Sequence, residues 1–185
     1  MIFQEIGLAG AYLIDPEPYR DERGLFARTW SITEFRERGL VTEFDHCATS
    51  FNKLPGTLRG LHYQADEEPE TKLIRCTRGR IFDVIVDLRQ DSPTYRQWFG
   101  TELNQDNRRL IYAPAGFAHG YQSLGPDSEV FYQIAANFRP DLQRGLRWDD
   151  PALAIKWPQV RARIISTRDL ALPQLAGVPE AACTP

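Results

Sequence analysis

Basic side chains that could transfer protons lie in three short stretches of this chain of 185 residues. The first is Arg59-Gly-Leu-His62-Tyr-Gln64, the second is Lys72, and the third is Pro114-Ala-Gly-Phe-Ala-His119-Gly120. The chain has only three histidines, and two of them lie in these glycine-bracketed segments. Histidine is the usual proton carrier near neutral pH. A base at His62, a fixed cation at Lys72 and nearby guanidinium groups therefore predict carbanion chemistry on an anionic substrate.

Short strands are expected to position these residues. Residues 81–88 mix β-branched and apolar side chains, which predicts a largely buried strand. Residues 72–77 alternate, and because Gly79 lies between the two segments, they predict a hairpin. Two further strands are predicted at residues 109–113 and 129–134, each closed by proline or glycine signals.

One segment, Ser31–Gly39, has the pattern of a helix. Ser31 is placed to cap its N-terminus, with Glu34 three residues on, and Gly39 is placed to end it. Short strands at close spacing with one or two helices predict an all-β fold, an antiparallel β-sandwich or jelly-roll barrel. We expect one domain over residues 1–175 and a mobile tail over residues 176–185.

Composition argues against several classes of protein. The net charge of -3 and the pI near 5.7 disfavour general nucleic-acid binding, so an anionic ligand needs a local arginine cluster. No apolar run is long enough to predict a transmembrane helix, and the N-terminus lacks the pattern of a signal peptide. Cys47, Cys76 and Cys183 form no CxxC pair for zinc or redox chemistry, so a reducing cytoplasm is the expected location.

The segment Pro114-x-Gly116-x-x-His119 resembles the second motif of the cupin superfamily, in which the histidine projects from a strand into a barrel. The first cupin motif usually supplies two histidines and a glutamate to a metal ion. In the matching segment Gly60–Gln64, Gln64 stands where the second histidine would be. The resemblance therefore implies a cupin without a metal, and a metal-dependent cupin is the alternative. His119 also has a second interpretation, as a buried histidine hydrogen-bonded to backbone in the barrel core.

The chain is similar to the dTDP-4-dehydrorhamnose 3,5-epimerase family, a group of metal-free cupins, over nearly its whole length. The segments that carry the resemblance are residues 21–26, 56–64, 72–79, 83–89, 92–94, 114–120, 147–151, 157–158 and 166–169. Each segment alone is a weak signal, whereas their order and spacing together are a strong one. The resemblance implies a homodimeric, cofactor-independent epimerase of a nucleotide-linked 4-keto-6-deoxy sugar.

The resemblance also implies roles for four side chains. Epimerisation beside a ketone removes a proton, passes through an enolate and returns a proton to the opposite face. His62 would be the base and Asp169 its orienting carboxylate. Lys72 would hold the enolate oxygen, and Tyr132 would be the acid on the other face. The plainer alternatives are a solvated loop carboxylate for Asp169, a surface charge for Lys72 and simple packing for Tyr132.

Substrate binding is expected from arginine and aromatic side chains, because planar guanidinium groups match phosphate oxygens. Arg59 is the first candidate to bind the nucleotide diphosphate, and Arg23 is the second. Phe26 is expected to stack on the base. His119 and Gln64, from the two cupin segments, complete the predicted substrate-binding set.

Three places depart from the family's pattern. Many members carry Gln-x-Asn where this chain has His46-Cys47-Ala48, glutamate where it has Arg28, and tyrosine where it has Phe138. The predicted catalytic set is intact while the binding periphery is altered. This combination keeps open a single-centre epimerase of a modified deoxysugar. Outside the enzymes, the alternative is a non-catalytic cupin that binds a sugar nucleotide.

Overall fold

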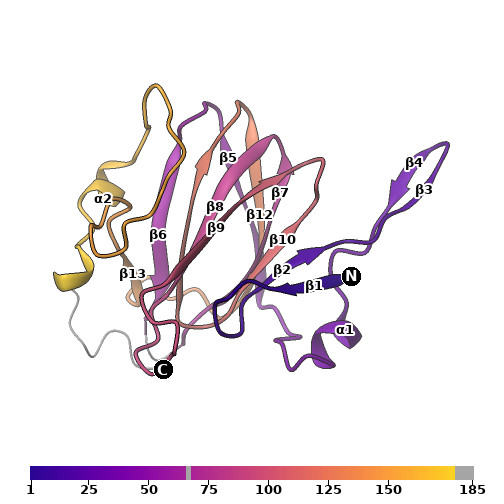
Figure 1. Ribbon diagram of the computed structural model, residues 1–185, viewed down its shortest axis with the longest axis horizontal. Coiled ribbons are helices and arrows are strands. Elements are labelled where there is room, and N and C mark those ends of the chain that lie inside the picture. Colours follow the sequence, from indigo (N-terminus) through magenta and orange to yellow (C-terminus); the bar gives the residue numbers. More distant parts are fainter. Residues whose placement is uncertain (66–67, 178–185) are drawn as a thin grey trace.

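The computed structural model describes residues 1–65 and 68–177, which form two antiparallel sheets packed into a sandwich (Figure 1). The first sheet has six strands in the spatial order β1 (Ile2–Glu5), β2 (Tyr12–Asp15), β10 (Leu110–Ala113), β7 (Thr71–Arg78), β12 (Ser128–Ala135) and β5 (His46–Asn52). The second has five, in the order β13 (Gln143–Gly145), β6 (Leu58–Gln64), β11 (Phe117–Ser123), β8 (Arg80–Asp87) and β9 (Trp98–Asn104). The predicted all-β jelly roll is confirmed.

The remaining elements are short and lie outside the two sheets. They are the hairpin β3 (Tyr19–Asp21) and β4 (Gly24–Phe26), the helices α1 (Ile32–Arg36) and α2 (Thr167–Leu170), and the 3-10 helix η1 (Leu175–Gly177). Figure 1 shows the β3–β4 hairpin projecting from the sandwich on the side away from α2. No helix among the described residues is long and apolar enough to cross a membrane.

The burial of strand β8 on both faces explains why its sequence is almost continuously apolar. Ile81 and Ile85 belong to a core that both sheets share, whereas Val84 and Val86 belong to a second core on the other face. The strand is therefore buried on both faces, as predicted. Because side chains alternate along a strand, Asp83 lies on the same face as Ile81 and Ile85. A carboxylate is thereby placed in the interior of the sandwich.

The hairpin predicted around Gly79 is wrong. β7 pairs with β10 and β12 in the first sheet, while β8 pairs with β11 and β9 in the second. Gly79, with φ of 70°, turns the chain from one sheet to the other. A Cβ at this glycine would lie 2.6 Å from the Ser128 hydroxyl oxygen, so a larger residue does not fit. The turn at Gly79 is present as predicted, but distant segments decide which strands β7 and β8 pair with.

The other predicted elements are present. The Ser31 side chain accepts a hydrogen bond from the Glu34 N–H and caps α1, as expected. The Glu34 carboxylate does not return to the cap, since it binds the Met1 ammonium group at 2.8 Å. The strands predicted at 109–113 and 129–134 are β10 and β12. Most of the predicted tail, residues 178–185, lies outside the described residues.

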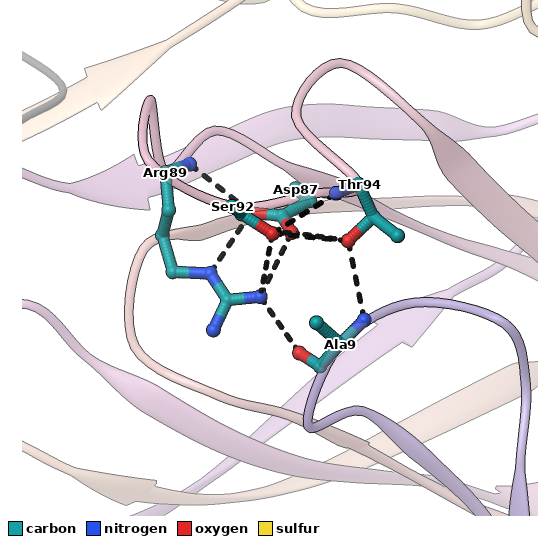
Figure 2. Close-up of polar contacts among 5 residues, drawn as sticks. All are labelled: Ala9, Asp87, Arg89, Ser92 and Thr94. Carbon is teal, nitrogen blue, oxygen red and sulfur yellow. Dashed lines mark hydrogen bonds and ion pairs between the residues drawn. The ribbon is translucent and has the colours of Figure 1, made fainter.

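A polar cluster ties the loop after β8 to the N-terminal loop between β1 and β2 (Figure 2). The fully buried Asp87 carboxylate accepts hydrogen bonds from the Arg89 guanidinium group at 2.8 and 2.9 Å and from the Thr94 hydroxyl at 2.7 Å. The Ser92 hydroxyl is a further donor to this carboxylate. Arg89 also donates to the Ala9 carbonyl at 2.7 Å, and Thr94 accepts from the Ala9 N–H at 3.1 Å. The cluster therefore joins two loops that are far apart in the sequence.

Candidate active site

A cavity of about 540 Å³ lies between the two sheets. β5 and β12 of the first sheet, β6 and β11 of the second, and the segment 164–169 line it. Five of the nine predicted site residues contribute to this lining, and they are Arg59, His62, His119, Tyr132 and Asp169. The two histidine segments singled out in the sequence thus meet at one cavity, together with Tyr132 and Asp169.

His62 and Asp169 form a hydrogen-bonded pair at this cavity. The His62 Nε2 lies 2.8 Å from Asp169 Oδ1, and the Gly60 N–H donates to Asp169 Oδ2 at 3.1 Å. The Ser166 hydroxyl caps α2 by accepting from the Asp169 N–H at 3.1 Å, which fixes this residue on the first turn. Asp169 is only 4% exposed, so the interpretation as a solvated loop carboxylate is excluded.

The electrostatics of this pair fix the tautomer of the imidazole. Burial raises the pKa of Asp169, but the hydrogen bond and charge of His62 and the Gly60 N–H outweigh it, so its pKa is lowered. An ionised carboxylate only accepts hydrogen bonds, so Nε2 of His62 carries the hydrogen. In the neutral imidazole, Nδ1 is then left with its lone pair. The pair is suited to take up a proton at Nδ1.

His119 forms a second histidine–aspartate pair. Its Nε2 lies 2.8 Å from Asp83 Oδ2, and Asp83 is fully buried, so the partner is a carboxylate rather than backbone. Sequence reasoning missed Asp83, although a carboxylate inside a buried strand was a signal available to it. In residues 1–65 and 68–177, no group of three or more His, Cys, Asp or Glu side chains is arranged to hold a metal ion.

Tyr132 approaches the same cavity from the opposite sheet. Its ring meets the His119 ring edge-on, with ring centroids 5.7 Å apart. Desolvation of its phenol raises the pKa of Tyr132 well above the usual value, and the neighbouring hydroxyl of Tyr121 adds to this. The phenol therefore stays protonated and can act as an acid.

Two arginines supply positive charge at the cavity. The Arg59 Nε donates to Asn52 Oδ1 at 3.0 Å, and its Nη2 donates to the Phe51 carbonyl at 3.3 Å, which orients the guanidinium group. Arg168 is exposed and also lines the cavity. Sequence reasoning missed Arg168, although it directly precedes Asp169 in the segment 166–169. Two guanidinium groups in one cavity suit a diphosphate.

Lys72 and Gln64 do not line the cavity. Lys72 is buried, with its Nζ 2.6 Å from Glu70 Oε1 and 3.5 Å from the His62 carbonyl, so it is not a surface charge. The Gln64 amide donates to the carbonyls of residues 68 and 137 and accepts from Arg139 N–H and Gln143 Nε2. This uses all its hydrogen-bonding positions, one on the segment between β6 and β7 and three on residues 137–143.

Arg23 and Phe26 lie on the projecting β3–β4 hairpin. The Arg23 Nε donates to Asp21 Oδ2 at 3.1 Å, and the Phe26 side chain is 76% exposed. The hairpin and α2, which carries Asp169, lie on opposite sides of the molecule (Figure 1). Within one chain, the structure therefore does not bring these two predicted binding residues to the cavity.

The three positions that depart from the family's pattern lie at different distances from the cavity. On β5, Ala48 pairs with Tyr132 of β12. The asparagine that many family members carry at this position would therefore lie next to the predicted acid. Arg28 makes a long ion pair of 3.6 Å with Glu34 near α1. Phe138 is 64% exposed. Of the three, only Ala48 is the cross-strand neighbour of a residue that lines the cavity.

Several known proteins resemble this chain in sequence and fold. A sequence model of the family described as dTDP-4-dehydrorhamnose 3,5-epimerase matches residues 5–177. A relative of that name from Methanothermobacter thermautotrophicus is 44% identical over 169 residues, covering 90% of each chain. A Legionella pneumophila dTDP-6-deoxy-D-glucose-3,5-epimerase, solved in complex with dTDP-4-keto-L-rhamnose, is 32% identical with a TM-score of 0.93, covering 99% of this chain and 97% of that one. A 3'-monoepimerase from Streptomyces bikiniensis, in complex with dTDP-quinovose, is 28% identical with a TM-score of 0.86, covering 92% and 86%.

Proposed function

The chain belongs to the dTDP-4-dehydrorhamnose 3,5-epimerase family, and we propose that its cavity carries out the family's reaction on a dTDP-linked 4-keto-6-deoxy sugar. One observation carries the assignment: His62 and Tyr132, the proposed base and acid, line a single cavity from opposite sheets. His62 comes from β6 of the second sheet and Tyr132 from β12 of the first. A module that only binds a sugar nucleotide has no need of this arrangement.

The proposed mechanism begins at Nδ1 of His62, which removes a proton from a carbon beside the ketone. Asp169 stabilises the imidazolium that forms, because its carboxylate lies 2.8 Å from Nε2. Tyr132 then delivers its phenolic proton to the opposite face of the same carbon. Both groups belong to the chain, so this chemistry calls for no cofactor.

The enolate oxygen needs positive charge or a hydrogen-bond donor between removal of the first proton and delivery of the second. Lys72 is the proposed source, although it does not line the cavity: its buried ammonium group lies 3.5 Å from the His62 carbonyl and 2.6 Å from Glu70 Oε1, and its charge would act on the enolate without direct contact. His119 also lines the cavity, and in the imidazolium form it would have a second N–H donor besides the one directed at Asp83. Arg59 and Arg168 are proposed to bind the diphosphate.

The proposal is tested by incubation with dTDP-4-keto-6-deoxyglucose in deuterated water, followed by NMR. Deuterium at two sugar carbons with inversion at both supports a 3,5-epimerase. Deuterium at one carbon supports a single-centre epimerase, which is the second candidate because of the similarity to a 3'-monoepimerase. A protein that binds the nucleotide sugar without any exchange contradicts both.

The proposal extends to the assembly and the location of the protein. A homodimer would give the exposed β3–β4 hairpin a surface to cover, and the same hairpin of a second copy would bring Arg23 and Phe26 to the substrate. Residues 1–175 would form one catalytic domain. Cys47 and Cys76 are free thiols, which fits the reducing cytoplasm where nucleotide-sugar synthesis is expected.

A further inference from the structure

Asn52 is a buried amide at the end of β5 that the mechanism above does not use. It is 1% exposed, and its side chain has hydrogen-bond partners on three other strands. Its Nδ2 donates to the Ser128 carbonyl of β12 at 3.1 Å. Its Oδ1 accepts from the Tyr121 hydroxyl of β11 at 3.1 Å and from Arg59 Nε of β6 at 3.0 Å. The amide therefore joins the two sheets beside two residues that line the cavity, Arg59 and Tyr121.

These partners fix the orientation of the Asn52 amide. A carbonyl oxygen only accepts hydrogen bonds and a guanidinium group only donates them, so Nδ2 has to face Ser128 and Oδ1 has to face Arg59. With the Tyr121 hydroxyl as its second donor, Oδ1 uses both of its lone pairs. The oxygen that Arg59 contacts is therefore held in place from several strands.

This contact matters because Arg59 has a long, exposed side chain at the cavity. Its Nη2 also donates to the Phe51 carbonyl at 3.3 Å, so Nε and Nη2, which share one edge of the guanidinium group, are both bonded to protein. A guanidinium group has five N–H donors, and Nη1 carries two of the three that these contacts leave over. The edge formed by Nη1 and Nη2 can then bind two phosphate oxygens at once.

We propose that Asn52 is a positioning residue for substrate binding, which holds one edge of the Arg59 guanidinium group so that the other edge meets the diphosphate of the nucleotide. The inference rests on the proposed function, because Arg59 has a diphosphate to bind only if the ligand is a nucleotide-linked sugar. The amide is neutral, so it holds the guanidinium group without cancelling its charge, as a carboxylate would. A side chain that is ordered before the ligand arrives loses less conformational entropy on binding.

The test is Asn52→Leu, which keeps a side chain of similar size and removes both polar groups. We expect the Kd for dTDP, measured by calorimetric titration, to rise about three- to tenfold, because binding then has to order one long side chain. The KM for the sugar nucleotide should rise in parallel. The kcat should change by less than about twofold, because a phosphate contact is present in both the ground and the transition state.

Gln122→Leu is the matched control, because it removes the same kind of amide outside the cavity. Gln122 is fully buried, its Nε2 donates to the Pro158 carbonyl at 3.1 Å, and its Oε1 accepts from Arg163 Nε at 3.0 Å. Neither Gln122 nor Arg163 lines the cavity. The control should lose stability in urea as Asn52→Leu does, while its Kd for dTDP stays within about twofold of the wild-type value.

A double-variant cycle separates positioning from a general structural role. In an Arg59→Ala background Asn52 has no guanidinium group to hold, so adding Asn52→Leu should change the Kd for dTDP by less than about twofold. A further loss as large as that of the single variant, an unchanged Kd in the single variant, or a fall in kcat alone would each overturn the proposal.

Asn52→Ala is a second variant with the same expected results, and it replaces Asn52→Leu if the leucine variant does not fold. Failure of both variants to fold would overturn the proposal in favour of a purely structural role. Wild-type protein that binds no dTDP, or that exchanges no substrate protons with solvent, would instead overturn the proposed function.

Discussion

The two histidine–aspartate pairs have the same separation but different surroundings. In each, an Nε2 lies 2.8 Å from a carboxylate oxygen, and the two histidines are paired across β6 and β11. The His62 side chain keeps 35% of its surface exposed, whereas the His119 side chain keeps 6%. Only His62 combines a carboxylate partner with open access to a ligand. The general base is therefore expected at His62.

The change His62→Asn tests this assignment. Asparagine can still donate to Asp169 but cannot take up a proton, so exchange of substrate protons with solvent should fall by about 10² to 10⁴. NMR in deuterated water measures the exchange, and calorimetric titration with dTDP is the control, where affinity should stay close to that of the wild type. More than a tenth of wild-type turnover in the variant would assign the base to another group.

Arg59 and Lys72 should affect different kinetic constants. A phosphate contact is present in both the ground and the transition state, so Arg59→Ala should mainly raise KM. Charge on the enolate oxygen develops only during the reaction, so Lys72→Ala should mainly lower kcat. Steady-state kinetics of the two variants measure the division. Equal changes in both constants for both variants would contradict it.

At the scale of elements, the sequence predicted strands and turns better than it predicted their partners. The strands around 72–77 and 81–88 and the turn at Gly79 were all present, but β7 and β8 joined different sheets. Asp83 and Asn52 show the same limit, because each gains its role from a strand distant in the sequence. Cavity residues that carry a recognisable motif, such as His62, were predicted, since their types and spacing are local information.

The Asp87 cluster gives a prediction about the join between two loops (Figure 2). Asp87→Asn weakens the bonds from Arg89 and should lower the free energy of unfolding by about 2 kcal/mol. Urea unfolding of the wild type, of Asp87→Asn and of a control variant measures this free energy. Asp141→Asn is the matched control, because its ion pair with Arg139 is exposed, and it should show no measurable change. A loss no larger than the control's would show that the cluster does not stabilise the fold.

The same cluster has a defined dependence on pH. Burial raises the pKa of Asp87, but hydrogen bonds from Arg89, Ser92 and Thr94 outweigh it and leave the pKa below its ordinary value of 3.8. A lowered folded-state pKa gives stability that is fully present above 3.8 and is lost as the pH falls through the folded value. Unfolding curves at acidic pH should therefore converge for wild type and Asp87→Asn.

At the scale of the whole molecule, the hairpin and the cavity lie apart within one chain. The cavity of one chain lacks the predicted contacts of Arg23 and Phe26, while the hairpin that carries them projects from the sandwich with Tyr19 and Phe26 exposed. Sequence alone cannot distinguish a contact within a chain from a contact between copies, and it predicted one site for all these residues. The two-fold pairing of a homodimer would give each cavity one hairpin.

Mixing two inactive variants distinguishes a hairpin that contacts the cavity of the second copy from one that contacts the cavity of its own chain. One variant carries His62→Asn with an intact hairpin, and the other carries Arg23→Ala and Phe26→Ala with an intact His62. If the hairpin acts across the dimer, the mixed dimer contains one complete site, and activity should return on mixing after dissociation and reassembly. If the hairpin acts on its own chain, no complete site forms and the mixture stays inactive. Light scattering gives the mass of each sample, and a monomer with full activity would contradict the homodimer itself.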